Sequence, residues 1–148
     1  MVRQFHEKHS FQVGVQVHEN VGDQEAGINR MLDDLAEAVA QASGALHQQI
    51  NDGVNDIRVA RAQLMIEELG ELLQAMRDRD EEQLADAVTD LAYVVVGTAV
   101  AFDLPLDELF DEVHSSNMTK YADGTHKPSK GRSYAPPNIA QVLKGARQ

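Results

Sequence analysis

Apolar residues recur every three or four positions through most of the chain before residue 120, which is the spacing of one face of an α-helix. Over residues 24–52 this spacing predicts one long amphipathic helix that ends at Asp52-Gly53. A second helix is expected from about Asn55 to Arg77, with Asn55 or Asp56 as its N-cap. Strict alternation of apolar and polar residues is confined to residues 11–17, which we interpret as an extended linker.

A third helix should begin at Asp80, where Gln83 three residues later completes a variant of the capping box, and continue to Phe102. The short turn near Arg79 makes the second and third helices antiparallel neighbours. A fourth helix is predicted over residues 106–117, because Pro105 suits a first helical turn and the apolar stripe resumes there.

After Tyr121 the periodicity disappears into residues typical of loops, and Pro136-Pro137 is expected to open a last short helix. The sequence therefore predicts an all-α fold, an antiparallel helical bundle with about four main helices. We expect one domain over residues 1–148, with an N-terminal arm (1–23), a helical body (24–117) and a C-terminal loop and short helix (118–148).

The charge distribution narrows the classes of function. The net charge of −11 argues against binding to a nucleic acid polymer, which needs a basic face. Residues 115–148 nevertheless hold 6 Lys/Arg and only one acid, so a basic C-terminal segment follows an acidic body. The absence of cysteine excludes thiolate chemistry and is compatible with a cytoplasmic location. The longest uncharged run, residues 91–102, is too short to span a bilayer, so we expect a buried core helix and no membrane partner.

Several carboxylates stand on or beside the apolar faces of the second and third helices. On a helical wheel Glu68 falls within the apolar face, Glu71 lies at its edge and Glu67 lies slightly further round. Asp86 and Asp90 stand one turn apart at the head of the uncharged run. No Lys or Arg lies within one helical turn of Glu68, so a buried cluster of these acids needs another cation. All-oxygen ligation selects Mg²⁺ or Mn²⁺.

A plainer interpretation remains open for two of these acids. Glu67 and Asp86 are equally well explained as solvated helix residues that line a wet groove. For Glu68, Glu71 and Asp90 we favour the metal, because uncompensated burial of a charge is costly.

The sequence around these acids resembles a known family. Glu67-Glu68-Leu69-Gly70-Glu71-Leu72, followed by residues 86–98 (DAVTDLAYVVVGT), is similar to the all-α nucleotide pyrophosphohydrolases, the MazG-like and phosphoribosyl-ATP pyrophosphohydrolase-like proteins. Residues 110–120, Lys130-Gly131, residues 134–139 and the opening residues 2–8 resemble a MazG-like subgroup. The resemblance covers the first few residues and about residues 58–143.

The resemblance implies a helical bundle assembled as a homodimer or homotetramer. It also implies Mg²⁺-dependent hydrolysis of a nucleoside triphosphate to the monophosphate and pyrophosphate. Carried over by position, Glu68, Glu71 and Asp90 become metal ligands, and Glu67, or a bridging Glu68, accepts the proton of the attacking water. The chain departs from the family at Ala87, where the family has Glu.

Asp86, one residue before Ala87, then becomes a substitute ligand or binds the metal through water. Around this metal frame, other side chains are candidates to bind the nucleotide. The polar amide of Asn117 suits a base or ribose edge, and Tyr93 suits a base, although a cap and a core position are their respective alternatives. The basic residues suited to the phosphates are Lys120, Lys127, Lys130 and Arg132, for which a solvated tail is the alternative.

Three other functions compete with this one. A carboxylate-bridged di-iron bundle needs Glu-x-x-His on two helices, and the chain has no such motif. A non-catalytic helical interaction or oligomerisation module would explain the long stripe of residues 24–52, but not acids on an apolar face. A phosphoribosyl-ATP pyrophosphohydrolase would use the same metal frame on a different substrate.

Overall fold

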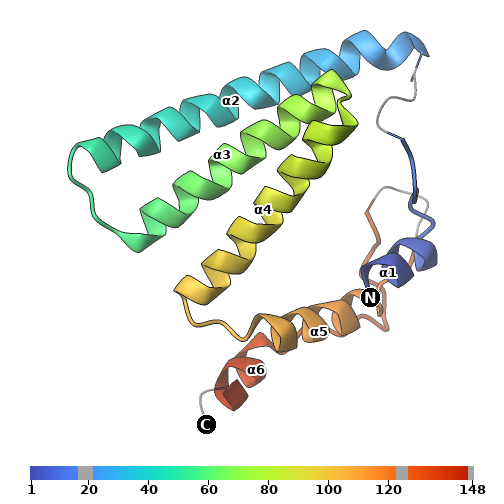
Figure 1. Cartoon of the computed structure of the whole chain (residues 1–148). Coiled ribbons are helices and arrows are strands. Elements are labelled where there is room, and N and C mark those ends of the chain that lie inside the picture. The colour runs from blue at the N-terminus through green and yellow to red at the C-terminus, as the bar shows by residue number, and fades with distance from the viewer. Residues whose placement is uncertain (17–21, 123–126, 147–148) are drawn as a thin grey trace. The chain divides into compact units, whose positions relative to one another are not determined.

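The computed structural model describes residues 1–16, 22–122 and 127–146. This described part holds six α-helices, one short 3₁₀-helix and no strand, which confirms the all-α prediction (Figure 1). The elements are α1 (Val2–Lys8), η1 (Gly22–Gln24), α2 (Glu25–Asn51), α3 (Ile57–Asp78), α4 (Glu81–Ala101), α5 (Leu106–Asn117) and α6 (Ile139–Ala146).

The four predicted main helices correspond to α2 through α5, and their ends differ from the predicted ends by at most two residues. The capping signals explain this agreement. Of the two residues proposed as N-cap of α3, Asp56 is the cap, since its carboxylate accepts a hydrogen bond from the Arg58 backbone nitrogen at 2.8 Å. Asp80 caps α4 in the same way and accepts from the Gln83 backbone nitrogen at 3.0 Å.

Two features of the helices were not predicted. The N-terminal arm contains α1, seven residues long, too short for its periodicity to be distinguished from chance. The turn from α3 into α4 was predicted near Arg79, but the left-handed conformation of that residue, with φ of 56°, was not.

The chain divides into two compact units. The helix-layer unit comprises residues 16–102, and the terminal unit comprises residues 1–15 and 103–148. The predicted single domain over residues 1–148 stays a prediction.

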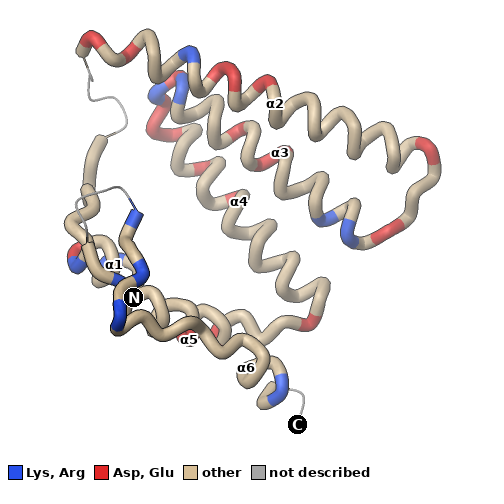
Figure 2. The backbone as a smooth tube through the Cα atoms, turned by 180° about the vertical axis from the view of Figure 1, so that it is seen from behind, with Lys and Arg blue, Asp and Glu red and all other residues tan. Residues whose placement is uncertain are grey.

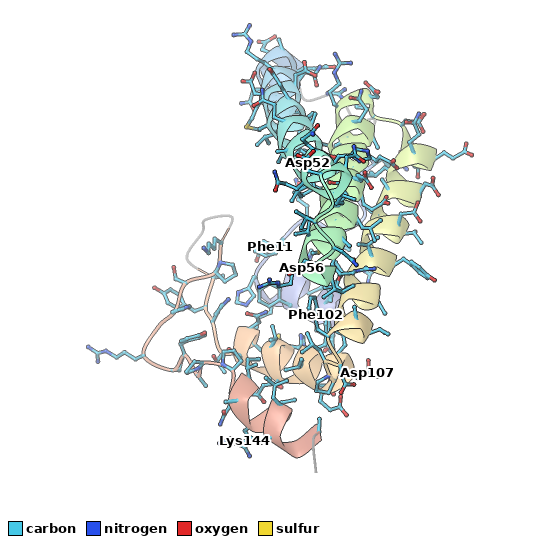
Figure 3. The ribbon with its side chains drawn as sticks, turned by 90° about the vertical axis from the view of Figure 1, so that its left-hand side faces the viewer. Phe11, Asp52, Asp56, Phe102, Asp107 and Lys144 are labelled. Atoms are coloured by element: carbon cyan, nitrogen blue, oxygen red, sulfur yellow. The ribbon has the colours of Figure 1, made fainter. Side chains whose placement is uncertain are left out.

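In the helix-layer unit, α3 lies between α2 and α4 and packs antiparallel against both (Figure 1). The turn between α2 and α3 is flanked by Asp52 and Asp56 (Figure 3). Ion pairs join α2 to the far end of α3: Arg77 Nε lies 2.9 Å from Asp33 Oδ1, and Arg79 Nη2 lies 3.3 Å from Glu25 Oε1. Exposed pairs of this kind add little stability.

Large apolar side chains remain exposed on this unit. The hydrophobic residues buried in the described part are Ala75, Ala87, Val94 and Ala99, whereas Tyr93 and Val100 of α4 are 79% and 76% exposed. The prediction that residues 91–102 form a buried core helix is therefore only partly correct. The layer is one helix thick, so a helix at its edge has one packed side and one open side.

Within the described part of the chain, α4 is long and apolar enough to cross a membrane by length and composition alone, with a mean hydropathy of 1.5 over 18 residues. The predicted uncharged run is too short, but the whole helix is long enough. Asp86 and Asp90 lie within α4, and carboxylates are costly in hydrocarbon. Packing against other helices therefore explains the apolar composition better.

In the terminal unit, α5 packs against α1 and α6. The Lys8 ammonium group at the end of α1 donates to the Met118 carbonyl oxygen just after α5. The Ser116 hydroxyl, on a residue only 5% exposed, donates to the Ala135 carbonyl at 2.8 Å. The backbone nitrogen of Asn138, just before α6, donates to Glu112 Oε1 of α5 at 2.6 Å. These contacts hold the irregular C-terminal segment against α5.

Candidate active site

Residues seven positions apart on α3 form a stripe that faces α4. Arg61, Glu68 and Ala75 are separated by two turns each, so they share one side of the helix. Arg61 reaches Val94 and Thr98 of α4, and Ala75 is 1% exposed. Glu68 is half-buried between these two packed residues. The predicted inward position of Glu68 is therefore found in the structure.

Glu68 is surrounded by like charges. Burial raises the pKa of the Glu68 carboxyl above its ordinary value, and the charges of Glu71, Asp90, Glu67 and Asp86 raise it further. No Lys or Arg contributes to this shift in the described part of the chain. The four acids that influence Glu68 are those singled out from the sequence. Glu68 is half-buried, whereas the other four acids are exposed, so the burial expected for Glu71 and Asp90 is not found. Figure 2 shows acidic segments along these helices and basic segments towards the ends of α3.

The donor set suits a hard divalent cation, because every group is a carboxylate and the cluster lacks positive charge. In the described residues, no three His, Asp or Glu side chains stand close enough to form a ready-made metal site. Repulsion between uncompensated carboxylates favours side chains that spread apart. The residues therefore fit a cation in type and charge, and their assignment as ligands stays a prediction.

Glu67 and Glu71 border a different space from Glu68. They line a pocket of about 490 Å³ between α2 and α3, together with Ser43 of α2 and seven other residues. Beside it lies Gln63, which is only 6% exposed and whose amide nitrogen donates to Glu67 Oε1 at 2.5 Å. The acids of α3 thus lie on two sides of the helix, with Glu68 towards α4 and Glu67 beside α2.

The family departure at Ala87 has a structural counterpart. Ala87 is 3% exposed, so the position that carries Glu in the wider family lies within the packed face of α4. Asp86 is exposed and borders a polar pocket of about 630 Å³ at the start of α4, one turn before Asp90. Asp86 is therefore open to water and lies one turn from Asp90. Because Asp86 stands one residue before Ala87, its side chain leaves the helix in a different direction from that of the glutamate at the family's position.

Arg61 has a role that the sequence did not predict. Its Nη2 donates to the Val94 carbonyl at 2.6 Å and its Nε donates to the Thr98 hydroxyl at 3.1 Å. A Cβ atom added to Gly97 would lie 2.9 Å from Arg61 Nη2. The glycine therefore makes room for the guanidinium group. In the sequence, the only signal at Gly97 was its place in an uncharged run, and that place indicates no partner for Arg61.

The nucleotide-binding candidates are divided between the two units. Tyr93 belongs to the helix-layer unit, where its side chain is largely exposed. Asn117 belongs to the terminal unit, where it borders a pocket of about 260 Å³ between α1 and α5. The other residues that line this pocket are Val2, Phe5, His6, Phe110, Val113 and His114. The aromatic and imidazole side chains from α1 were missed because no helix was predicted in the N-terminal arm.

The basic candidates also lie in the terminal unit. Tyr121 and Ser129 exchange backbone hydrogen bonds of 3.1 and 3.0 Å in an isolated antiparallel bridge, with Lys120 and Lys130 directly outside it. Lys130 Nζ lies 4.9 Å from the centre of the Tyr134 ring. Lys127 and Arg132 are exposed. Binding of phosphates by these four residues stays a prediction.

Comparison with known families identifies the chain. A family model described as phosphoribosyl-ATP pyrophosphohydrolase matches residues 41–117, more than half of the chain. The match contains all five acids around Glu68 and continues to Asn117. Comparisons with curated proteins and with solved structures gave no match. The chain belongs to the phosphoribosyl-ATP pyrophosphohydrolase family, in the MazG-like nucleotide pyrophosphohydrolase superfamily, whose members hydrolyse phosphoanhydride bonds.

Proposed function

We propose that this chain hydrolyses a nucleoside triphosphate to the monophosphate and pyrophosphate in the cytoplasm, with Mg²⁺ as cofactor and Mn²⁺ able to replace it. The observation that carries the proposal is the half-buried Glu68, whose pKa is raised by burial and by four neighbouring acids. An acidic site loaded with divalent cations attracts a polyphosphate, whereas the same site without them repels it. Phosphoribosyl-ATP is the second candidate substrate, because the matching family model is described by that activity.

In the proposed reaction, water attacks one phosphorus of the α–β phosphoanhydride, and the bond from phosphorus to the bridging oxygen breaks. Glu68, Glu71 and Asp90 would hold the metal, with Asp86 as a further or water-mediated ligand. Bound Mg²⁺ supplies neutralisation of phosphate charge and lowers the pKa of a bound water. Glu67 accepts the proton of the attacking water, and Glu68 is the alternative acceptor.

The terminal unit also contains candidates for contact with a nucleotide. We assign the base or ribose to the pocket between α1 and α5, where the Asn117 amide offers donors and an acceptor beside the Phe5 and Phe110 rings. We assign the phosphates to Lys120, Lys127, Lys130 and Arg132. Tyr93 is kept as a candidate for base contact.

We also propose that the chain self-associates as a homodimer or homotetramer. Tyr93, Val96 and Val100 form one stripe on α4, with exposed fractions of 79%, 50% and 76%. A contiguous exposed apolar stripe of this kind favours an interface over contact with water. In light-scattering measurements, Val100→Glu should shift the chain towards a smaller species, while Glu82→Lys outside the stripe should not. An unchanged mass for both variants contradicts the interface.

The catalytic proposal is tested by incubating the chain with canonical and modified nucleoside triphosphates and with phosphoribosyl-ATP, each with Mg²⁺, and measuring pyrophosphate. Asp90→Asn should lower kcat by at least about 100-fold, because a metal ligand is lost. Glu81→Gln, in the first turn of α4, serves as a matched control. Release of pyrophosphate that persists in Asp90→Asn and in Glu68→Gln contradicts the site, and no release from any substrate contradicts the function.

A non-catalytic interaction module remains the alternative class of function. Calorimetric titration with Mg²⁺ or Mn²⁺ separates the two. The proposed enzyme binds the cation and loses that binding in Glu71→Ala, whereas a simple interaction module has no such site to lose.

A further inference from the structure

A buried amide connects the proposed proton acceptor to the neighbouring helix. Gln63 of α3 is 6% exposed, and its Nε2 donates both to Ser43 Oγ of α2 at 3.0 Å and to Glu67 Oε1 at 2.5 Å. Gln63 and Glu67 are one helical turn apart, so the bond runs along α3, while the bond to Ser43 crosses to α2. The carboxylate of Glu67 is thereby attached to two helices through a single amide group.

The orientation of this amide follows from chemistry. An ionised carboxylate only accepts hydrogen bonds, so the atom of Gln63 that faces Glu67 must be the nitrogen. The amide oxygen, Oε1, is buried and has no hydrogen-bond partner within the described residues. A buried amide with an unused acceptor is unfavourable for folding, and an apolar side chain of similar size would fill the same space. Packing alone therefore does not explain a glutamine at this position.

The neighbourhood of Glu67 explains what the amide achieves. Glu67 is exposed and borders the pocket between α2 and α3, which Ser43 and Glu71 also line. An unrestrained glutamate on a helix surface samples several rotamers. The hydrogen bond from Gln63 removes most of that freedom while leaving the carboxylate open to the pocket. A catalytic base acts efficiently only when it is held near the proton that it accepts.

We propose that Gln63 is a positioning residue, whose amide nitrogen, anchored on Ser43, holds the Glu67 carboxylate at the α2–α3 pocket so that Glu67 accepts the proton of the attacking water. This inference rests on the proposed pyrophosphohydrolase function. It assigns no contact between Gln63 and the nucleotide. Loss of the amide should therefore lower kcat and leave KM nearly unchanged.

The test is a double-mutant cycle between Gln63→Leu and Glu67→Gln in the full chain, with kcat and KM measured for the best substrate. Gln63→Leu alone should lower kcat by about tenfold, a fraction of the 10²–10⁴ typical of general-base catalysis. In the Glu67→Gln background the same substitution should have no further effect. Gln48→Leu is the matched control, because Gln48 donates to Asp52, four residues later, on the exposed surface of α2.

A second readout does not depend on activity. In ¹⁵N–¹H spectra, the side-chain amide protons of Gln63 should show slow solvent exchange and should shift when Glu67 is replaced by Gln. Equal losses of kcat from Gln63→Leu in both backgrounds overturn the positioning role, as do amide signals that ignore Glu67→Gln. An active chain with either result leaves the proposed function intact. An intact chain that hydrolyses no nucleotide overturns the function, and this role with it.

Discussion

The two sides of α3 are built on different principles. Towards α2, the stripe of Gln63, Gly70 and Arg77 makes complementary contacts. The Gln63 amide donates to the Ser43 hydroxyl, and the Arg77 guanidinium pairs with Asp33. A Cβ atom added to Gly70 would lie 3.5 Å from Val39, so α2 packs closely there. Towards α4, the stripe of Arg61, Glu68 and Ala75 holds charges without opposite partners among the described residues. One side stabilises the hairpin, and the other retains repulsion that a cation can relieve.

This difference indicates where function is concentrated in a thin layer of helices. Complementary contacts need no ligand, and they set how α2 lies along α3. Unbalanced acids around a half-buried carboxylate such as Glu68 lower stability, which is expected at sites that bind ions or substrates. Substitutions on the two sides should therefore have different consequences.

Gly97→Ala should have the largest effect on stability. The added Cβ lies 2.9 Å from Arg61 Nη2, so the guanidinium must withdraw from the Val94 carbonyl. We expect the free energy of unfolding in urea to fall by about 1–3 kcal/mol. Gly44→Ala on α2 is the control, since its Cβ meets no described atom within 4 Å and should gain roughly 0.5–1 kcal/mol of helix propensity. Equal behaviour of the two variants contradicts the role of Gly97.

Glu68→Gln should raise the Tm by a few degrees when divalent cations are removed. The folded state raises the pKa of Glu68 from 4.5, so the unpaired carboxylate costs stability as pH rises through and above that value. The variant loses this cost. Adding Mg²⁺ should then stabilise the unchanged chain and leave the variant unaffected, as thermal melts with and without chelator will show. A variant that melts lower than the unchanged chain without cations contradicts electrostatic repulsion at Glu68.

Asp56→Ala should lower the Tm, and this should be the smallest of the three effects, because only the N-cap of α3 is lost. The hydrogen bonds from Arg58 lower the pKa of Asp56 from 3.8 to about 2. A lowered carboxyl pKa contributes stability that is complete above 3.8 and is lost as pH falls through about 2. In a series of melts at decreasing pH, the difference in Tm between the unchanged chain and Asp56→Ala should therefore shrink as the pH falls from 3.8 to about 2. A difference independent of pH assigns the effect to another cause.

The α2-facing side of α3 was the harder of the two to predict from sequence. Helix ends followed from local signals such as Asp56 and Asp80, which need no knowledge of the partner helix. The five acids were singled out because burial of charge without a basic neighbour is visible on a helical wheel. Gln63 gave no signal, because a glutamine within a helix is usually a solvated residue. On the α4-facing side, the hydrogen bonds of Arg61 were not predicted either, because they depend on the room that Gly97 leaves.

The arrangement of the acids also exceeded what the wheel can give. A wheel places Glu67 and Glu71 near Glu68, but the pocket between α2 and α3 depends on how α2 packs against α3, which a wheel cannot give. In the same way, α1 could not be predicted from its own seven residues, because contacts with residues more than a hundred positions later in the sequence hold it in place.

The bridge between Tyr121 and Ser129 holds two parts of the basic segment side by side. A Cβ atom at Gly131 would lie 2.9 Å from the Tyr121 ring, so the chain passes close against that ring directly after the bridge. Lys120 and Lys130 are therefore brought to adjacent backbone positions by hydrogen bonds that exist before any anion arrives. An anion that binds there needs to immobilise two side chains and very little backbone, which reduces the entropy lost on association.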